Sequence, residues 1–256
     1  GGHSLIPVMK LRLAAPGNLV DLGGIADLKG IRQDGSDVVI GAMTTQAEVI
    51  ASDLLAAAVP ILRETALVIA DPQVRAMGTI GGNAANGDPG NDMPAVMMAL
   101  DARYMLASKG GERTVPARGF YQGVYLTGLA QGEVLTAIRI KAPAKGHGYA
   151  YEKLKRKVGD YATAAAAVIL TMSGGKVATC AIGLTNVGDH ALLAEDAARI
   201  SVGSGLDPAT VRQATAAAEA ITAPAADGHG PAAYRTKMAG VMLARALARA
   251  KARAGG

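Results

Sequence analysis

The sequence has 256 residues, of which half are apolar and 18% are charged, and its net charge at neutral pH is +5. A chain of this length can bury one large or two smaller cores, and the composition is ordinary for a soluble globular protein. No stretch approaches the roughly 20 apolar residues that a membrane-spanning helix needs, and the basic residues are scattered, so we expect neither a membrane protein nor a nucleic-acid-binding protein. The nearest approach to a basic stripe, Arg245, Arg249 and Arg253, is expected to be a solvated helix face.

Cysteine and histidine are too sparse to build a metal centre. Cys180 is the one cysteine, and the four histidines are far apart, so the sequence offers no disulfide framework and no ligand spacing typical of zinc or iron–sulfur sites. Redox chemistry would therefore need an organic cofactor or the metal centres of a partner. The opening stretch GGHSLIPVMK has no signal-peptide pattern, and we expect a cytoplasmic protein.

The first half of the chain is predicted to alternate short strands and helices. Thr45 and Glu48 have the spacing of a capping box ahead of a helix, and Pro60 is suited to the start of a second helix. Other elements follow from alternation, apolar runs and turn residues. They are strands over 18–25, 36–44 and 133–143, a helix over 93–100, and a hairpin around 109–111.

The second half is predicted to be a small α+β domain. The stretch KAPAKGHG, residues 141–148, is the best candidate for a domain boundary because it combines Pro, Gly and Lys between structured segments. A β-hairpin is expected around Gly174 and Gly175, which supply the positive φ angles of a tight turn. Helices are expected over 208–221 and 231–250, each with Pro at its first position.

Two glycine-rich stretches are candidates for binding, GGHS at 1–4 and GTIGGN at 78–83. Neither has the spacing of a phosphate loop or of a Rossmann fingerprint. Both combine bare backbone with side-chain donors, at Ser4, Thr79 and Asn83, and consecutive N–H groups in such stretches can hold an anion such as a pyrophosphate. A simple turn explains each stretch about as well, so the residues alone leave the choice open.

Two charged residues also need an interpretation. Asp92 precedes an apolar run, so it is either a helix N-cap or an acceptor for a ribose or ribityl hydroxyl. Lys153 alternates with Lys155 and Lys157, a pattern typical of an exposed strand face.

Three longer stretches resemble the signature sequences of a known family: GGHSLIPVMKLRLAAP, DPQVRAMGTIGGNAANGDPGNDMPA and YEKLKRKVGDYATAAAAV. They are similar to those of the FAD-binding medium subunits of molybdenum hydroxylases, the xanthine dehydrogenase family. GPAAYRTKMAGVMLARAL resembles the C-terminal helix of that family. Within the family, the motifs are most similar to those of the aerobic carbon monoxide dehydrogenase flavoprotein, and the resemblance covers essentially the whole chain.

The resemblance implies an α+β fold with PCMH-type FAD-binding subdomains, like those of vanillyl-alcohol oxidase, and a C-terminal α+β domain with an antiparallel sheet and helices. The family has a strand–helix–strand element ahead of the first glycine stretch that this sequence lacks. We therefore expect a remnant of the N-terminal FAD-binding subdomain at 1–21, the second subdomain at 22–145, and the CO-dehydrogenase-flavoprotein-like domain at 146–256.

The resemblance also implies a cofactor site without catalytic side chains or metal ligands. The FAD pyrophosphate would lie between the two glycine stretches. Lys153 would lie near the flavin, where a cation favours the reduced form, and Tyr161 would cover one flavin face. The implied cofactor-binding residues are Gly1, Gly2, His3, Ser4, Ala70, Val74, Thr79, Ile80, Gly81, Gly82, Asn83, Asp88, Asp92, Leu135, Lys153 and Tyr161.

The implied function is electron transfer in a dimer of heterotrimers. A large subunit with a molybdenum–molybdopterin cofactor would oxidise carbon monoxide, and a small subunit with two [2Fe-2S] clusters would pass the electrons to FAD. The flavin would deliver them to a quinone, through a peripheral contact, or to another acceptor. Three alternatives remain: the same subunit of a xanthine, aldehyde or N-heterocycle hydroxylase, a stand-alone flavin reductase of the same fold, and a cofactor-free scaffolding chain.

Overall fold

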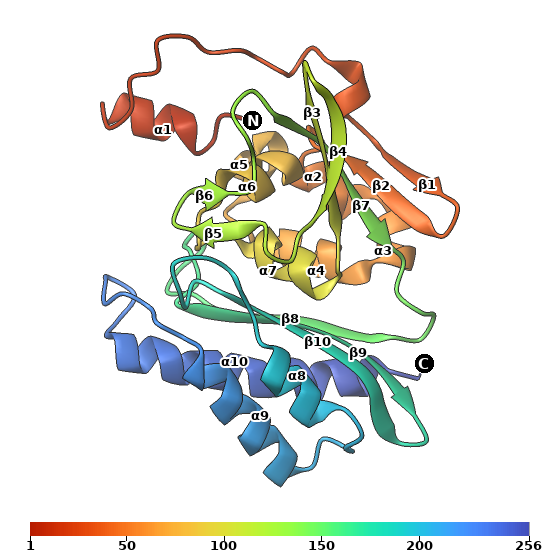
Figure 1. The fold of residues 1–256 in the computed structure, drawn as a ribbon. Coiled ribbons are helices and arrows are strands. Elements are labelled where there is room, and N and C mark those ends of the chain that lie inside the picture. The colour runs from red at the N-terminus through yellow and green to blue at the C-terminus, as the bar shows by residue number, and fades with distance from the viewer. Residues whose placement is uncertain (256) are drawn as a thin grey trace.

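The computed structural model describes residues 1–255 and arranges them in alternating layers of sheet and helix (Figure 1). An N-terminal sheet is followed by a layer of helices, a second sheet, and a final layer of three helices. Both larger sheets are antiparallel, and strands and helices are segregated within the second half of the chain, so the expected α+β class is confirmed. No helix in the described range has the length and apolar character that crossing a membrane requires.

The N-terminal segment is largely irregular. It contains helix α1 (Leu5–Lys10) and the short 3-10 helix η1 (Ala26–Leu28), and the strand expected over 18–25 is wrong. Val20 in that segment is 83% exposed. An apolar run becomes a strand only where a neighbouring strand takes up its backbone hydrogen bonds, and none lies beside this segment.

The first sheet has five strands in the order β1-β2-β7-β3-β4. The predicted hairpin and the predicted strands over 36–44 and 133–143 are confirmed within it. Ile40 lies opposite Ile138 and both are fully buried, because this face of the sheet covers the core. Strands β5 and β6 form a separate two-stranded sheet. The bounds are β1 (Ile31–Asp34), β2 (Asp37–Gly41), β3 (Arg103–Ser108), β4 (Gly111–Pro116), β5 (Tyr121–Gly123), β6 (Leu126–Thr127) and β7 (Val134–Lys141).

Six helices lie between β2 and β3 in sequence. The predicted capping box is confirmed, since Thr45 Oγ1 accepts from the Glu48 backbone N–H and the Glu48 carboxylate accepts from the Thr45 N–H. Pro60 begins a helix as expected. The bounds are α2 (Gln46–Ala51), α3 (Asp53–Ala58), α4 (Pro60–Val68), α5 (Pro72–Met77), α6 (Ile80–Asn86) and α7 (Asp92–Ala99).

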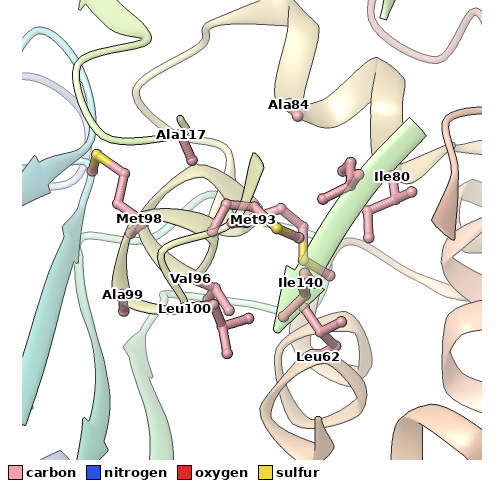
Figure 2. Close-up of a cluster of buried hydrophobic side chains, with 14 of the residues drawn as sticks. Leu62, Ile80, Ala84, Met93, Val96, Met98, Ala99, Leu100, Ala117 and Ile140 are labelled. Atoms are coloured by element: carbon pink, nitrogen blue, oxygen red, sulfur yellow. The ribbon is translucent and has the colours of Figure 1, made fainter. Parts of the chain in front are cut away.

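Helix α7 is buried along its whole length because it lies between the two sheets. Figure 2 shows its Met93, Val96 and Met98 within a cluster of aliphatic side chains that includes Leu62 and Ile140. The sequence has no Trp and one Phe, and this part of the core is filled by Met and branched aliphatic residues.

The second sheet has the order β11-β10-β9-β8 and packs against α4 and α7 on one face and α10 on the other. The β9–β10 hairpin is confirmed, with φ of +56° at Gly174 and +76° at Gly175. Both C-terminal helices are confirmed, although Pro231 precedes the last one rather than starting it. The bounds are β8 (Gly148–Leu154), β9 (Ala164–Ser173), β10 (Lys176–Thr185), β11 (Leu192–Leu193), α8 (Glu195–Ser201), α9 (Pro208–Ala220) and α10 (Ala232–Arg253).

The basic residues of α10 do not form a free solvated face. Arg249 and Arg253 reach across β8 to the Glu64 carboxylate of α4, at 3.2 and 2.7 Å. Glu64 also accepts from the Tyr151 backbone N–H at 2.7 Å. These contacts join the C-terminal layers to the helical layer. Arg245 and Arg249 are exposed as expected, whereas Arg253 is half-buried.

Candidate functional site

A cavity of about 580 Å³ opens where the N-terminal segment, helices α5 to α7 and the loop after β8 come together. Both glycine-rich stretches contribute to its wall although they are far apart in sequence. The lining residues are Gly1, Gly2, His3, Ser4, Leu5, Gln46, Ile69, Ala70, Val74, Gly78, Thr79, Gly82, Asn83, Ala85, Asn86, Asn91, Asp92, Lys153, Gly159, Asp160 and Tyr161.

The glycines of the two stretches serve close packing as much as the cavity. A Cβ on Gly1 would lie 1.9 Å from the carbonyl oxygen of Met77, so a side chain there would separate the two stretches. A Cβ on Gly81 would lie 2.4 Å from Cβ of Ala42. The second stretch is not a loop but the start of α6, where Thr79 caps the Gly82 N–H.

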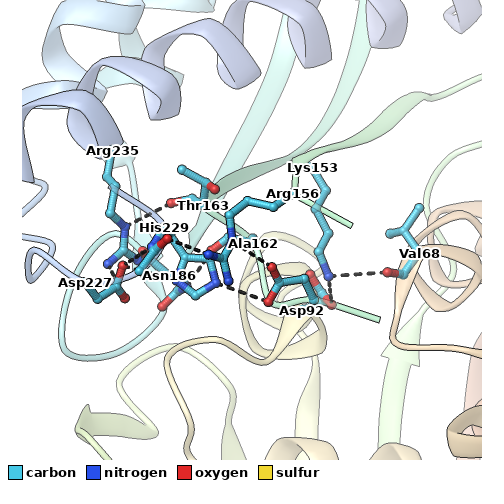
Figure 3. Close-up of polar contacts among 12 residues, drawn as sticks. Val68, Asp92, Lys153, Arg156, Ala162, Thr163, Asn186, Asp227, His229 and Arg235 are labelled. Carbon is cyan, nitrogen blue, oxygen red and sulfur yellow. Dashed lines mark hydrogen bonds and ion pairs between the residues drawn. The ribbon is translucent and has the colours of Figure 1, made fainter. Parts of the chain in front are cut away.

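Asp92 and Lys153 form a buried ion pair in the cavity wall, drawn in Figure 3. Their Oδ2 and Nζ atoms lie 2.7 Å apart, and Tyr151 donates to the other carboxylate oxygen at 2.6 Å. The N-cap interpretation of Asp92 is excluded, because Asn91 occupies the cap position and the Asp92 carboxylate faces Lys153 and Tyr151. Burial raises the pKa of Asp92, and Lys153 and Tyr151 oppose that rise.

Lys153 at the end of β8 and Lys155 just after it do not form the exposed strand face that their spacing predicts. The Lys153 side chain is only 2% exposed. Lys153 and Lys155 both donate to the Val68 carbonyl oxygen at 3.3 Å, which closes the end of α4. Burial, together with the neighbouring Lys153 charge, lowers the pKa of Lys155.

Tyr161 lies at the mouth of the cavity and is 45% exposed. Its hydroxyl donates to Oδ2 of Asp88 at 3.2 Å, and the Tyr125 hydroxyl donates to the same atom at the same distance. Burial and the Asp88 charge both raise the pKa of Tyr161, so the phenol stays neutral near neutral pH. Asp88 therefore orients the ring from outside the cavity wall.

The loop that carries Tyr161 is tied to the segment before α10 (Figure 3). Arg156 donates to Oδ2 of Asp160 at 3.0 Å and to the Gly228 carbonyl oxygen at 2.7 Å. His229 lies 3.3 Å from the other Asp160 oxygen. Arg235, which is 3% exposed, donates to Asp227, and Asp227 also contacts His229. The C-terminal layer thus fixes one edge of the cavity.

Most of the residues expected from the sequence line this cavity. The exceptions are four: Asp88 lies behind Tyr161, Ile80 and Leu135 are buried in the core, and Gly81 packs on Ala42. Several wall residues were not predicted from the sequence. They are Leu5, Gln46, Ile69, Ala85, Asn86, Asn91, Gly159 and Asp160, while Gly78 belongs to the second glycine-rich stretch.

Some of the missed residues carried a local signal. Asn86 is one helical turn after Asn83 and therefore shares its face. Gln46 carried none, because a polar residue directly after a helix N-cap is usually solvated. Its Nε2 and Oε1, the Asn83 Oδ1 and the Asn86 Nδ2 are buried without a hydrogen-bond partner in the protein.

Comparison with known proteins gives matches over nearly the whole chain. Residues 1–143 match the FAD binding domain in molybdopterin dehydrogenase, and residues 149–250 match the CO dehydrogenase flavoprotein C-terminal domain. The carbon monoxide dehydrogenase medium chain of Afipia carboxidovorans is 68% identical, over 99% of this chain and 88% of that protein. The corresponding chain of Hydrogenophaga pseudoflava is 51% identical over the same shares. A crystal structure of the cyanide-inactivated Cu,Mo-CO dehydrogenase superposes with a TM-score of 0.98 and 68% identity, again over 99% of this chain and 88% of that one.

Proposed function

The chain belongs to the family of FAD-binding subunits of molybdopterin dehydrogenases, and we propose that it is the FAD-carrying medium subunit of an aerobic carbon monoxide dehydrogenase. It is then an oxidoreductase subunit in which electrons from the oxidation of CO and water to CO2 pass through FAD to a quinone or another acceptor. The observation that carries this proposal is the 68% identity to a carbon monoxide dehydrogenase medium chain over 99% of the sequence.

The cavity fits the cofactor that the family implies. Its wall includes backbone of both glycine stretches, at Gly1, Gly2 and Gly82, and its unpartnered carboxamides offer hydrogen bonds that the protein itself does not use. When bound there, FAD supplies the reversible two-electron chemistry, and the protein supplies binding, orientation and electrostatics.

The protein's own residues would tune that chemistry. We propose that Lys153 favours the reduced cofactor by charge attraction, with Asp92 holding its ammonium group in place. Tyr161 shields the mouth of the cavity from solvent, and Asp88 orients its ring. Ala70 and Val74 provide the apolar wall for the ring system.

We assign Ile80, Gly81 and Leu135 to the support of that wall, since they lie behind it rather than in it. We further propose that the FAD-binding part ends within 141–148, close to the gap between the two family matches.

The proposed setting is a complex with a large molybdopterin subunit and a small subunit holding two [2Fe-2S] clusters, arranged as a dimer of heterotrimers in the cytoplasm. The relatives are medium chains of carbon monoxide dehydrogenases, which supports a role within a multi-subunit enzyme. The absence of a His, Cys, Asp or Glu cluster suited to a metal among residues 1–255 is compatible with metal centres held by other chains.

The test is anaerobic reduction of the complex as purified. With CO as the electron donor, the visible absorbance of FAD should bleach, and an added quinone should restore it. Xanthine, an aldehyde and an N-heterocycle are the control donors. Bleaching by one of the controls but not by CO would assign the subunit to a different hydroxylase. A complex without FAD would overturn the electron-transfer role itself.

A further inference from the structure

Three carboxamide side chains in the cavity wall have buried polar atoms without a protein partner. They are Gln46 at the start of α2 and Asn83 and Asn86 on α6. Gln46 is the extreme case, because both Nε2 and Oε1 are unpaired although the residue is only 2% exposed. Buried amide atoms in native proteins are nearly always hydrogen-bonded, so a group of exceptions around one cavity indicates a ligand that pairs them.

Gln46 lies beside the junction of the two glycine stretches. Its backbone N–H donates to the Gly78 carbonyl oxygen at 2.8 Å, and the preceding Thr45 bridges to Thr79. Gly1 in turn packs on Met77 and Gly78. The Gln46 backbone is thus held against the second stretch, close to where the first one meets it.

The unpaired atoms define the chemistry of the group that they would bind. Amide nitrogens of Gln46 and Asn86 are donors, whereas amide oxygens of Gln46 and Asn83 are acceptors. A ligand that pairs all of them must present acceptor oxygens together with hydroxyl or N–H donors. A diphosphate next to a ribityl or ribose group has this pattern.

The charges of the wall limit how an anionic group could be held there. Lys153 is ion-paired with Asp92, and Asp160 is paired with Arg156, which lies outside the wall. No arginine among the described residues lines the cavity. Of the described residues that line the cavity, His3 and Lys153 are the other basic ones, and Lys153 is already paired, so a diphosphate bound here would be held largely by backbone N–H groups and carboxamides.

We propose that Gln46, assisted by Asn86, binds the diphosphate of FAD and the adjoining sugar hydroxyls, and that Gln46 is a residue on which the affinity for the dinucleotide depends. This proposal rests on the proposed function, since it takes FAD as the ligand. A glutamate at position 46 would have the same shape but would repel the diphosphate by its negative charge. The neutral amide of Gln46 therefore favours binding of an anionic ligand.

The test measures FAD binding rather than turnover. The complex with its partner chains is stripped of FAD and titrated with FAD and, in competition, with ADP, which carries the diphosphate but not the flavin ring. Gln46→Met keeps the side-chain length and removes the hydrogen bonds, and Gln46→Glu keeps the shape and adds a charge. Gln73→Met, on the exposed face of α5 outside the cavity, is the matched control.

Gln46→Met should weaken both FAD and ADP about tenfold or more, the range for a hydrogen bond to a charged group, and Gln46→Glu should weaken them further. The control should bind as the wild type does. Because no partner in the protein is lost, Gln46→Met should leave the melting temperature of the FAD-free complex unchanged or raised.

FAD affinity within about twofold of wild type in both Gln46 variants, or an affinity loss confined to FAD with ADP unaffected, would overturn this inference and leave the proposed function intact. A lowered melting temperature of the FAD-free Gln46→Met complex would also overturn it, since that marks a structural role. A wild-type complex that takes up no FAD would instead overturn the proposed function.

Discussion

Lys153 and Asp92, which are far apart in sequence, form an ion pair of 2.7 Å in which both side chains are almost fully buried. The pair joins the C-terminal end of strand β8 to the first turn of helix α7, and it lies in the wall of the cavity proposed to hold FAD. If one of the two charges is removed by substitution, the other is left unpaired in a low-dielectric site. Substitutions of Lys153 and of Asp92 should therefore shift the potential of a bound redox group in opposite directions.

Lys153→Met should lower the midpoint potential of the flavin, because the cation that favours the reduced form is gone. Asp92→Asn should raise it, because the Lys153 charge is then no longer balanced. Shifts of about 30 mV, or ~1.4 kcal/mol for a two-electron couple, are expected in each direction. Spectroelectrochemical titration of the complex measures both. Equal potentials in the wild type and both variants would place the pair away from the flavin.

The Gly81 position should tolerate no side chain. Gly81→Val should abolish FAD retention, because its Cβ would lie 2.4 Å from Cβ of Ala42 and push α6, which carries Thr79 and Asn83, away from the first sheet. Gly17→Ala, with no atom within 4 Å of the added Cβ, is the control. Flavin content per purified complex is the measurement. A variant that stays yellow would show that α6 does not bind the cofactor.

The Glu64 carboxylate should contribute to the docking of the C-terminal layers. It accepts from the Tyr151 N–H at 2.7 Å and pairs with Arg249 and Arg253 of α10. Glu64→Leu removes these contacts and should lower the free energy of unfolding by about 2 kcal/mol, within the range for a lost hydrogen bond to a charged acceptor. Urea denaturation measures the loss. Glu195→Leu, at the start of α8 and outside this contact, is the control.

The stability of the fold should decrease at acidic pH because of Glu133. Hydrogen bonds from Arg113 and from the Ala130 N–H lower the pKa of Glu133 from its ordinary 4.5 to about 2. A carboxyl whose folded-state pKa is lowered stabilises the fold above pH 4.5, and this contribution is lost as the pH falls towards about 2. The melting-temperature difference between wild type and Glu133→Gln should therefore shrink across that window. A constant difference would contradict the assignment.

Local signals in the sequence predicted much of the fold. The capping box of Thr45 and Glu48 and the turn glycines 174 and 175 act over a few residues, so their outcome is independent of distant packing. The strand expected over 18–25 failed for the opposite reason, because strand formation needs a partner that the pattern does not encode.

The site depended on long-range packing in the same way. Lys153 has the pattern of an exposed strand face, and it is buried only because β8 packs on α4 and Lys153 pairs with Asp92 of α7. Gln46 follows a helix cap, where polar residues are normally solvated, and its burial arises from the junction of segments that are distant in sequence. The prediction that Lys153 lies near the cofactor came from the family resemblance and not from the local pattern.

The most direct test of the account is native mass spectrometry of the intact complex, combined with flavin quantification after release. The account predicts one FAD for each copy of this chain, bound in a complex that also contains a large and a small partner chain. A complex in which this chain carries no flavin, or a chain purified alone and colourless under conditions in which the partners are present, would contradict it.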